Sequence, residues 1–147
     1  MIDVDHFKRI NDEHGHPAGN HVLKEIVNRA TSALRPSDLM ARMGGEEFAV
    51  VMPEADLNAA LQIAERLRSR VGNAPIEGVA VTVSIGAAVV RPDVEEELDA
   101  TLRRADAALY KAKRAGRNCV IADGSREPPL ASDFDAASAS RISFPYA

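Results

Sequence analysis

Two acidic side chains in this sequence, Asp3 and Glu46, have the type and placement for a magnesium site. Asp3 lies in the apolar run of residues 1–4, which is typical of a buried strand. Glu46 follows the glycine pair Gly44-Gly45 between two further apolar runs. If these runs pair as neighbouring strands, the two carboxylates lie close together and supply the hard oxygen ligands that Mg²⁺ prefers. The alternative is that Asp3 caps a turn and that Glu46 is a solvated hairpin residue.

Basic side chains suited to phosphate binding occur in two places. Lys8 lies in a helical turn that begins after the first strand, where free backbone N–H groups are ready partners for phosphate oxygens. Lys113 and Arg117 are four residues apart near the end of a helix, so we expect them to share a face. Neither place requires a ligand, because Lys8 is compatible with simple solvation and the helix dipole favours cations at a C-terminus.

A further pair, Arg35 and Asp38, has the form R-x-x-D. The guanidinium fork of arginine chelates phosphate or guanine, and an aspartate accepts hydrogen bonds from a guanine edge. The same tetrapeptide is also typical of a helix end followed by a turn. The residues alone leave both interpretations open.

Hydrophobic periodicity predicts the helices and strands that must position these residues. Their order is β-α-β-β-α-β-α-β, which predicts an α+β domain with a ferredoxin-like sheet and its helices on one face. A type I′ turn is expected at Gly44-Gly45, and a bulge or close backbone approach at Gly86. The predicted helices cover residues 21–34, 56–72 and 98–112, and the predicted strands cover residues 1–4, 39–52 in two parts, 79–90 and 118–122.

Composition limits the class of protein. The chain has 147 residues, of which 46% are hydrophobic and 27% charged, as in a single globular domain. Its net charge of −4 argues against a general nucleic-acid-binding protein, which is usually basic. The single cysteine, Cys119, excludes an intrachain disulfide, and no apolar run approaches the roughly 18 residues of a membrane helix. We therefore expect a cytoplasmic domain that contacts neither a membrane nor a nucleic-acid polymer.

Four segments together strongly resemble the GGDEF family of diguanylate cyclases, in the family's order and spacing. They are DVDHFKRINDEHGHPAGN at residues 3–20, GGEEF at 44–48, TVSIG at 82–86 and RADAALYKAKRAGRN at 104–118. The resemblance implies a nucleotide-cyclase palm, with a mainly antiparallel central sheet and helices packed on it. It covers residues 1–122, as a domain that lacks its N-terminal part. The periodic pattern ends there, so we expect residues 123–147 to form a disordered tail.

The resemblance implies that the domain condenses two GTP molecules into cyclic di-GMP and releases two pyrophosphates. It implies two Mg²⁺ ions, for which Mn²⁺ can substitute, held by Asp3, the Val4 carbonyl and Glu46. Glu46 is further implied as the general base for the 3′-hydroxyl, and Lys8 as the cation that stabilises the transferring phosphoryl group. Each domain presents one GTP, so the resemblance also implies that catalysis needs a homodimer.

A set of GTP-binding residues is implied in the same way. Asn11 matches a position that reads the guanine edge, but its partner position, normally Asp in the family, is Asn20 here. The NH₂ group of an amide cannot accept from a guanine N–H donor, so Asn20 predicts weaker guanine selectivity. The implied substrate-binding residues are Phe7, Asn11, His16, Asn20, Gly44, Gly45, Lys113 and Arg117.

The resemblance finally implies an inhibitory site for cyclic di-GMP at Arg35 and Asp38, with Arg66 as a secondary contributor. Two other interpretations stay open at this point. One is a catalytically weak GGDEF domain that binds GTP or cyclic di-GMP as a receptor, which Asn20 favours. The other is a ferredoxin-like scaffold without a ligand. The intact acidic and basic residues at Asp3, Glu46 and Lys113 favour the enzyme.

Overall fold

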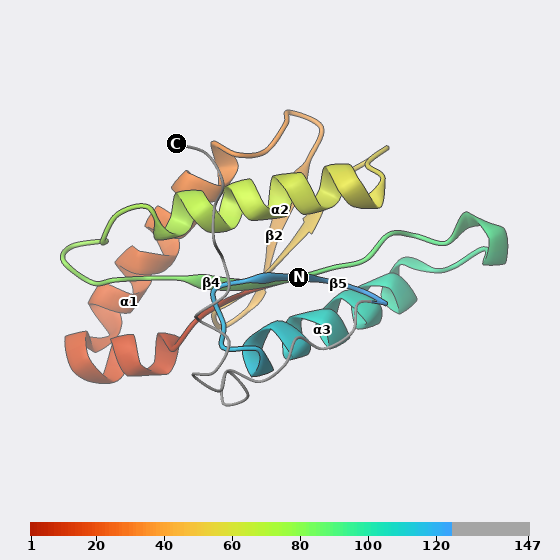
Figure 1. The fold of residues 1–147 in the computed structure, drawn as a ribbon. Helices are drawn as coiled ribbons and strands as arrows, with labels where there is room; N and C mark the ends of the chain where they lie inside the picture. Colours follow the sequence, from red (N-terminus) through yellow and green to blue (C-terminus); the bar gives the residue numbers. More distant parts are fainter. Residues whose placement is uncertain (125–147) are drawn as a thin grey trace, which may run out of the picture.

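The computed structural model describes residues 1–124, which form a five-stranded sheet and three α-helices (Figure 1). The element order of the prediction is confirmed, and so is the α+β class. Among these residues no helix has both the length and the apolar character needed to cross a membrane. The elements are β1 (Ile2–Val4), α1 (Phe7–Thr31), β2 (Leu39–Gly44), β3 (Glu47–Val51), α2 (Leu57–Gly72), β4 (Val83–Ala87), a 3-10 turn (Pro92–Val94), α3 (Leu98–Arg114) and β5 (Val120–Ala122).

The sheet has the strand order β2-β3-β1-β4-β5, so the short strand β1 lies at its centre. β1 runs antiparallel to both neighbours, and its residue Asp3 is opposite Glu47 on one side and Ser84 on the other. β4 and β5 are parallel. The sheet is therefore mixed but mainly antiparallel, and Asp3 is in its middle.

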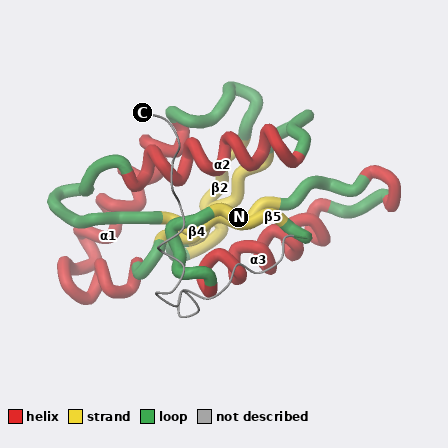
Figure 2. The backbone as a smooth tube through the Cα atoms, in the orientation of Figure 1, coloured by secondary structure: helices red, strands yellow, loops and turns green. Residues whose placement is uncertain are grey.

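Helices cover both faces of the sheet, so the prediction of one covered face is wrong. Figures 1 and 2 show α2 and α3 on opposite sides of the strands. Alternate strand residues point to opposite faces. Ile2, Val4 and Ile85 belong to the main core, together with residues of α1 and α2, whereas Ile121 packs in a second cluster with α3. Every residue of β4 is buried, and a strand that is buried on both faces needs a cover on both.

Helix α1 is longer than the sequence predicted and is kinked. It begins at Phe7 and continues to Thr31, whereas the prediction covered only residues 21–34. Gly15 interrupts it with φ 82° and ψ 159°, and Pro17 follows in the next turn. Gly15 and Pro17 interrupt the helical periodicity, which is why the amphipathic pattern was visible only beyond the kink.

The β2–β3 hairpin is confirmed, but its turn differs from the expected one. Gly44 pairs with Glu47, so the two loop residues are Gly45 and Glu46, and of these only Gly45 has positive φ, at 50°. A register shift between Arg42 and Gly44 places the extra residue in β2. A type I′ turn centred on the glycine pair is therefore wrong, because the bulge moves the turn one residue along the chain.

The remaining predicted elements agree with the structure in type and differ at their ends. β4 covers only Val83–Ala87 of the expected 79–90, and β5 begins at Val120 rather than 118. Gly86 is the point of close approach that the sequence predicted, since an added Cβ would lie 2.1 Å from the Ala105 carbonyl oxygen of α3. The expectation of a disordered tail concerns residues 125–147 almost entirely, and these lie outside the described residues.

Candidate active site

Asp3 is a buried carboxylate in the central strand, on the face that α3 covers. The Lys113 ammonium of α3 contacts it, with 2.7 Å between Nζ and Oδ2. Burial raises the pKa of Asp3, the bond to Lys113 opposes this rise, and the nearby charges of Glu46 and Glu47 add to it. The site therefore concentrates negative charge, and Lys113 is the cation that balances it.

Glu46 and Val4 lie beside Asp3, as the sequence predicted. The Val4 backbone N–H donates to the Glu46 carbonyl oxygen at 3.3 Å, which joins the end of β1 to the β2–β3 turn. The Glu46 side chain is partly exposed, and its carboxylate has no hydrogen-bond or ion-pair partner within residues 1–124. Asp3 of β1, which is paired with Lys113, and Glu46 of the β2–β3 turn, which has no such partner among residues 1–124, thus lie near each other.

The donor set fits a divalent magnesium-type cation. Among the described residues no three His, Cys, Asp or Glu side chains are grouped to hold a metal, so a cation here takes its other ligands from backbone carbonyls, water or substrate phosphate. Such a mixed, oxygen-only coordination is typical of Mg²⁺. The Lys113 ammonium shows that Asp3 already accommodates a positive charge at contact distance.

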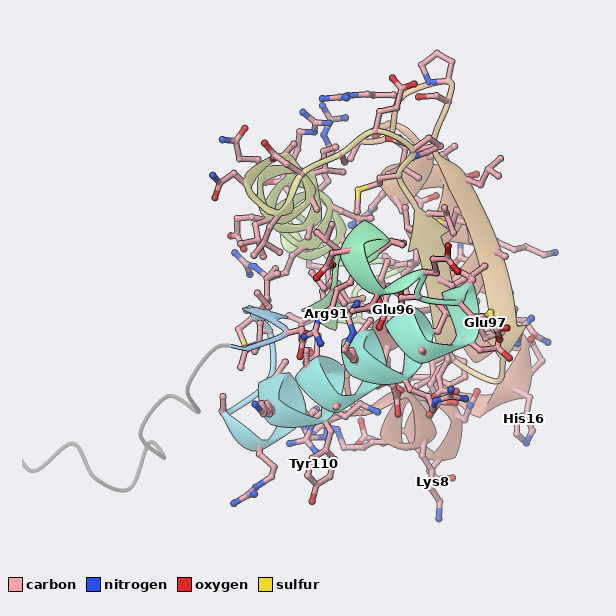
Figure 3. All side chains as sticks on the ribbon, turned by 90° about the vertical axis from the view of Figure 1, so that its right-hand side faces the viewer. Lys8, His16, Arg91, Glu96, Glu97 and Tyr110 are labelled. Carbon is pink, nitrogen blue, oxygen red and sulfur yellow. The ribbon has the colours of Figure 1, made fainter. Side chains whose placement is uncertain are left out.

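The start of α1 lies next to this cluster in sequence. His6 has a left-handed conformation, with φ 56°, and turns the chain from β1 into the helix. The Phe7 side chain packs in the core, which leaves its backbone as the part available to a ligand. Lys8 is exposed and extends away from the ribbon, as His16 also does (Figure 3). The structure therefore places these two side chains at the surface rather than against Asp3.

Lys113 and Arg117 do not share a helix face, which corrects the prediction. α3 ends at Arg114, and Gly116, Arg117 and Asn118 all have positive φ, at 108°, 66° and 46°. Arg117 therefore lies on a left-handed loop after the helix, exposed to solvent. The prediction extended the helical spacing past the end of α3, whereas the chain leaves the helix before Gly116, which lies between the two cations.

A pocket of about 410 Å³ lies between α1 and the β2–β3 hairpin, and Asn20 lines it. The sequence analysis assigned no role to two cations in the same lining, Lys24 and Arg42. The Arg42 guanidinium donates to the Gly45 carbonyl oxygen at 2.6 and 2.9 Å, so it also holds the exposed turn of Gly44 and Gly45. The remaining lining residues are Leu23, Val27, Met40 and Phe48.

Asn11, the other expected guanine reader, is partly buried against the backbone of Gly19. A Cβ added to Gly19 would lie 2.0 Å from Asn11 Oδ1, so only glycine leaves room for this rotamer. Asn11 does not line the pocket that contains Asn20. The structure therefore brings the two amides to the same helix but not to one described cavity.

Arg35 and Asp38 form a tight turn after α1. The Arg35 backbone N–H donates to Asp38 Oδ2 at 2.8 Å, and the Asp38 N–H donates to the Arg35 carbonyl oxygen at 3.0 Å. Arg66 of α2 approaches the same region, because its Nε donates to the Ala33 carbonyl oxygen at 3.2 Å. The three residues are therefore close together, and the turn interpretation and the ligand interpretation of the pair remain compatible.

Comparisons with known proteins agree with this architecture. Residues 1–119 match the family model described as "Diguanylate cyclase, GGDEF domain". The chain is 44% identical over 120 residues to the diguanylate cyclase DgcP of Pseudomonas aeruginosa, and 44% identical over 127 residues to the response regulator PleD of Caulobacter vibrioides. These matches cover 80% and 82% of the chain but only 18% and 28% of the relatives. The chain thus spans less than a third of the length of these two proteins.

Solved structures give the same result. The GGDEF domain of DgcB from Caulobacter crescentus, in complex with c-di-GMP, matches with a TM-score of 0.80 and 36% identity over 84% of this chain and 75% of that one. The active GGEEF domain of a diguanylate cyclase from Vibrio cholerae matches with a TM-score of 0.78 and 33% identity, over 85% and 81% of the two chains.

Proposed function

The chain belongs to the GGDEF-domain family of diguanylate cyclases, and we propose that it condenses two GTP molecules into cyclic di-GMP with release of two pyrophosphates. The observation that carries the proposal is the carboxylate of Asp3 in β1 with two groups near it: the Glu46 carboxylate of the β2–β3 turn and the Lys113 ammonium. We place this reaction in the cytoplasm. The direct test is incubation of the chain with GTP and Mg²⁺, followed by chromatography of the products.

In the proposed reaction, Asp3, Glu46 and the Val4 carbonyl would hold two divalent cations. Such ions would supply the positive charge that stabilises the attacking 3′-oxygen and the leaving pyrophosphate. Glu46 accepts the proton of the 3′-hydroxyl as its oxygen bonds to the α-phosphorus of the second GTP and the bond to pyrophosphate breaks. A partly exposed carboxylate is suited to this role, because no other side chain of residues 1–124 bonds to its proton-accepting oxygens.

In this proposal, three basic side chains bind the phosphate groups of GTP: Lys8, Lys113 and Arg117. Lys113, which contacts Asp3 in the structure, would bind the triphosphate, and Arg117 would contact the terminal phosphates from its exposed loop. Lys8 neutralises the transferring phosphoryl group. Because one domain presents one GTP, two copies meet face to face, and each supplies the 3′-hydroxyl that attacks the other's nucleotide.

In guanine recognition this chain differs from the usual family pattern, because Asn20 stands where the family normally has Asp. This difference leads to a prediction for Asn20→Asp. A carboxylate at this position accepts from both N–H groups of a guanine edge, and Lys24 and Arg42 in the same pocket favour its charged form. Charged hydrogen bonds exceed neutral ones by about 1 kcal/mol or more, so GTP should bind roughly tenfold more tightly to the variant. Weak acceptance of ATP by the parent chain should disappear.

Titration of GTP and ATP into both proteins measures this effect, with Asn28→Asp as a control on the exposed face of the same helix. The control should bind both nucleotides as the parent does. Equal GTP affinities for the parent and Asn20→Asp, with no ATP binding by either, would mean that the pocket reads guanine through other residues.

Product inhibition is proposed at Arg35 and Asp38, in the turn after α1, and at Arg66 of α2, which donates to the Ala33 carbonyl oxygen near that turn. Arg35→Ala should make the cyclase resistant to cyclic di-GMP, because the exposed guanidinium is the ligand-binding part of the turn while its backbone maintains the turn itself. We expect the half-inhibitory concentration to rise by about tenfold or more, the loss of one charge-assisted bidentate contact. Rate measurements at increasing cyclic di-GMP test this, and identical inhibition curves would remove the assignment.

A second function, as a receptor that binds GTP or cyclic di-GMP without turnover, is favoured by one observation. Asn20 replaces an expected carboxylate in the guanine pocket. The product chromatography separates the two proposals: a receptor binds nucleotide and forms no cyclic di-GMP, even when the concentration of the chain is raised to promote pairing of two copies.

A further inference from the structure

Asp5 is a buried carboxylate to which neither the sequence analysis nor the proposed reaction assigns a role. It lies between β1 and α1, with 5% of its surface exposed, and no Lys or Arg forms an ion pair with it among the described residues. Burying a carboxylate without a cation is costly unless hydrogen bonds satisfy it. Its partners therefore indicate what it does.

Three donors satisfy the Asp5 carboxylate, and one of them comes from the far end of the chain. Ser84 Oγ donates to Oδ1 at 2.6 Å, and Thr82 Oγ1 donates to Oδ2 at 2.7 Å, both from the neighbouring β4 region. The third donor is the backbone N–H of Asn118, at 3.0 Å from Oδ2. Asp5 thus binds directly to the peptide group that joins Arg117 to Asn118.

This peptide group belongs to the left-handed loop that follows α3. Arg117 and Asn118 have positive φ, a backbone conformation that residues other than glycine rarely adopt. Such a conformation is kept where the surrounding structure holds it. Asp5 holds the Asn118 backbone from the sheet side. From the other side, Arg68 Nη1 of α2 donates to the Asn118 side-chain oxygen at 2.6 Å. The loop is therefore fixed at one residue by two separate elements.

We propose that Asp5 is a positioning residue for Arg117: its carboxylate holds the left-handed loop so that the Arg117 guanidinium faces the terminal phosphates of GTP. The inference rests on the proposed function, because it takes the triphosphate as the ligand of Arg117. It adds a link between the strand that carries Asp3 and the loop that carries the phosphate-binding arginine. Asp3, the proposed metal ligand, and Asp5, which holds the loop of Arg117, thus lie two residues apart at the end of β1.

A thermodynamic cycle on the full chain tests the proposal, with Asp5→Asn, Arg117→Ala and the double variant. GTP and GMP affinities are measured by calorimetry, because GMP lacks the terminal phosphates. Arg117→Ala and Asp5→Asn should each weaken GTP binding by about tenfold and change GMP binding by less than about twofold, and the double variant should be no weaker than Arg117→Ala alone. Ser84→Ala is the matched control, because it removes a donor from the same carboxylate without touching the loop, and should bind GTP as the parent does.

The outcomes separate this inference from the proposed function. If Arg117→Ala weakens GTP binding but Asp5→Asn does not, or if the two effects add, the positioning role is wrong and the phosphate role stands. If Arg117→Ala leaves GTP affinity unchanged, the phosphate role of Arg117 is wrong and the inference falls with it. Equal losses for GTP and GMP in Asp5→Asn would assign Asp5 to general stability alone.

A measurement on the unaltered chain covers the case in which Asp5→Asn does not fold. The Asn118 amide should exchange its hydrogen about as slowly as the amides of β4, although Asn118 itself is exposed, because a buried carboxylate accepts it. Arg68→Ala, which removes the second anchor, should accelerate this exchange and weaken GTP binding. Exchange of the Asn118 amide at the rate of a free loop amide in the parent would overturn the proposal.

Discussion

Replacing Glu46 with glutamine should reduce the formation of cyclic di-GMP by at least about 100-fold, the usual size of a lost general base. The variant should fold and melt like the parent, because the Glu46 carboxylate has no partner within residues 1–124 whose loss would destabilise the chain. The amide keeps the size of the side chain but can neither accept the 3′-hydroxyl proton nor provide a charged ligand for Mg²⁺. Initial rates with GTP and Mg²⁺, together with melting curves, measure both effects.

Glu97→Gln is the control for this experiment. Glu97 precedes α3 at the end of the helix far from Lys113, is exposed and forms no capping hydrogen bond with its side chain (Figure 3). It makes the same change in net charge, so its cyclase rate should equal that of the parent. Turnover of Glu46→Gln within a few-fold of the parent would show that another group accepts the proton and would remove Glu46 from the catalytic assignment.

Replacing Gly86 with alanine should cause a large loss of stability. The new Cβ would lie 2.1 Å from the Ala105 carbonyl oxygen, 2.2 Å from the Leu109 nitrogen and 2.8 Å from the Leu109 Cα. These are backbone atoms of α3, which cannot rotate away as a side chain would, so the helix must move off the sheet. Overpacking of this kind costs about 3 kcal/mol or more, and the melting temperature should fall by on the order of 10 °C.

Urea unfolding and thermal melting of Gly86→Ala measure this loss, with Gly72→Ala as the matched control. Gly72 ends α2, and a Cβ there would lie 3.9 Å from the Val81 carbonyl oxygen and 4.0 Å from the Thr82 methyl group, which is ordinary contact. Since alanine favours a helix over glycine, the control should be as stable as the parent or slightly more stable. A melting temperature of Gly86→Ala within two or three degrees of the parent would contradict the close packing of α3 on β4.

The order of helices and strands, and the meeting of Asp3 with Glu46, could be predicted from the sequence. Both depend on local sequence patterns: alternation of apolar residues in strands, a 3.6-residue period in helices, and glycines at a hairpin. Strands joined by such a hairpin are neighbours in a sheet. β1 pairs with β3, the second strand of the hairpin, and this pairing brings Asp3 near the turn that carries Glu46. The motif spacing added the family and, with it, the roles that were assigned to these residues.

The local details of the loops could not be predicted in the same way. The turn of the hairpin moved to Gly45 and Glu46 because one residue of β2 bulges, and Arg117 left the helix because the chain turns at Gly116. In both places a short sequence is compatible with two backbone paths. The choice depends on the pairing and packing of the flanking elements, which no window of a few residues contains.

The side of the sheet that each helix covers, and the partners of the buried charges, depend on how the elements pack together. The periodicity of α3 shows that one of its faces is apolar, but it does not say which face of the sheet that stripe meets. Once α3 packs opposite α2, its last turn brings Lys113 to Asp3, and the loop beyond it brings the Asn118 amide to Asp5, 113 positions away in the sequence. Contacts between such distant residues form only when the whole sheet is assembled. The apolar pattern of a helix shows that one of its faces must be buried, but it does not specify the face of the sheet on which the helix packs.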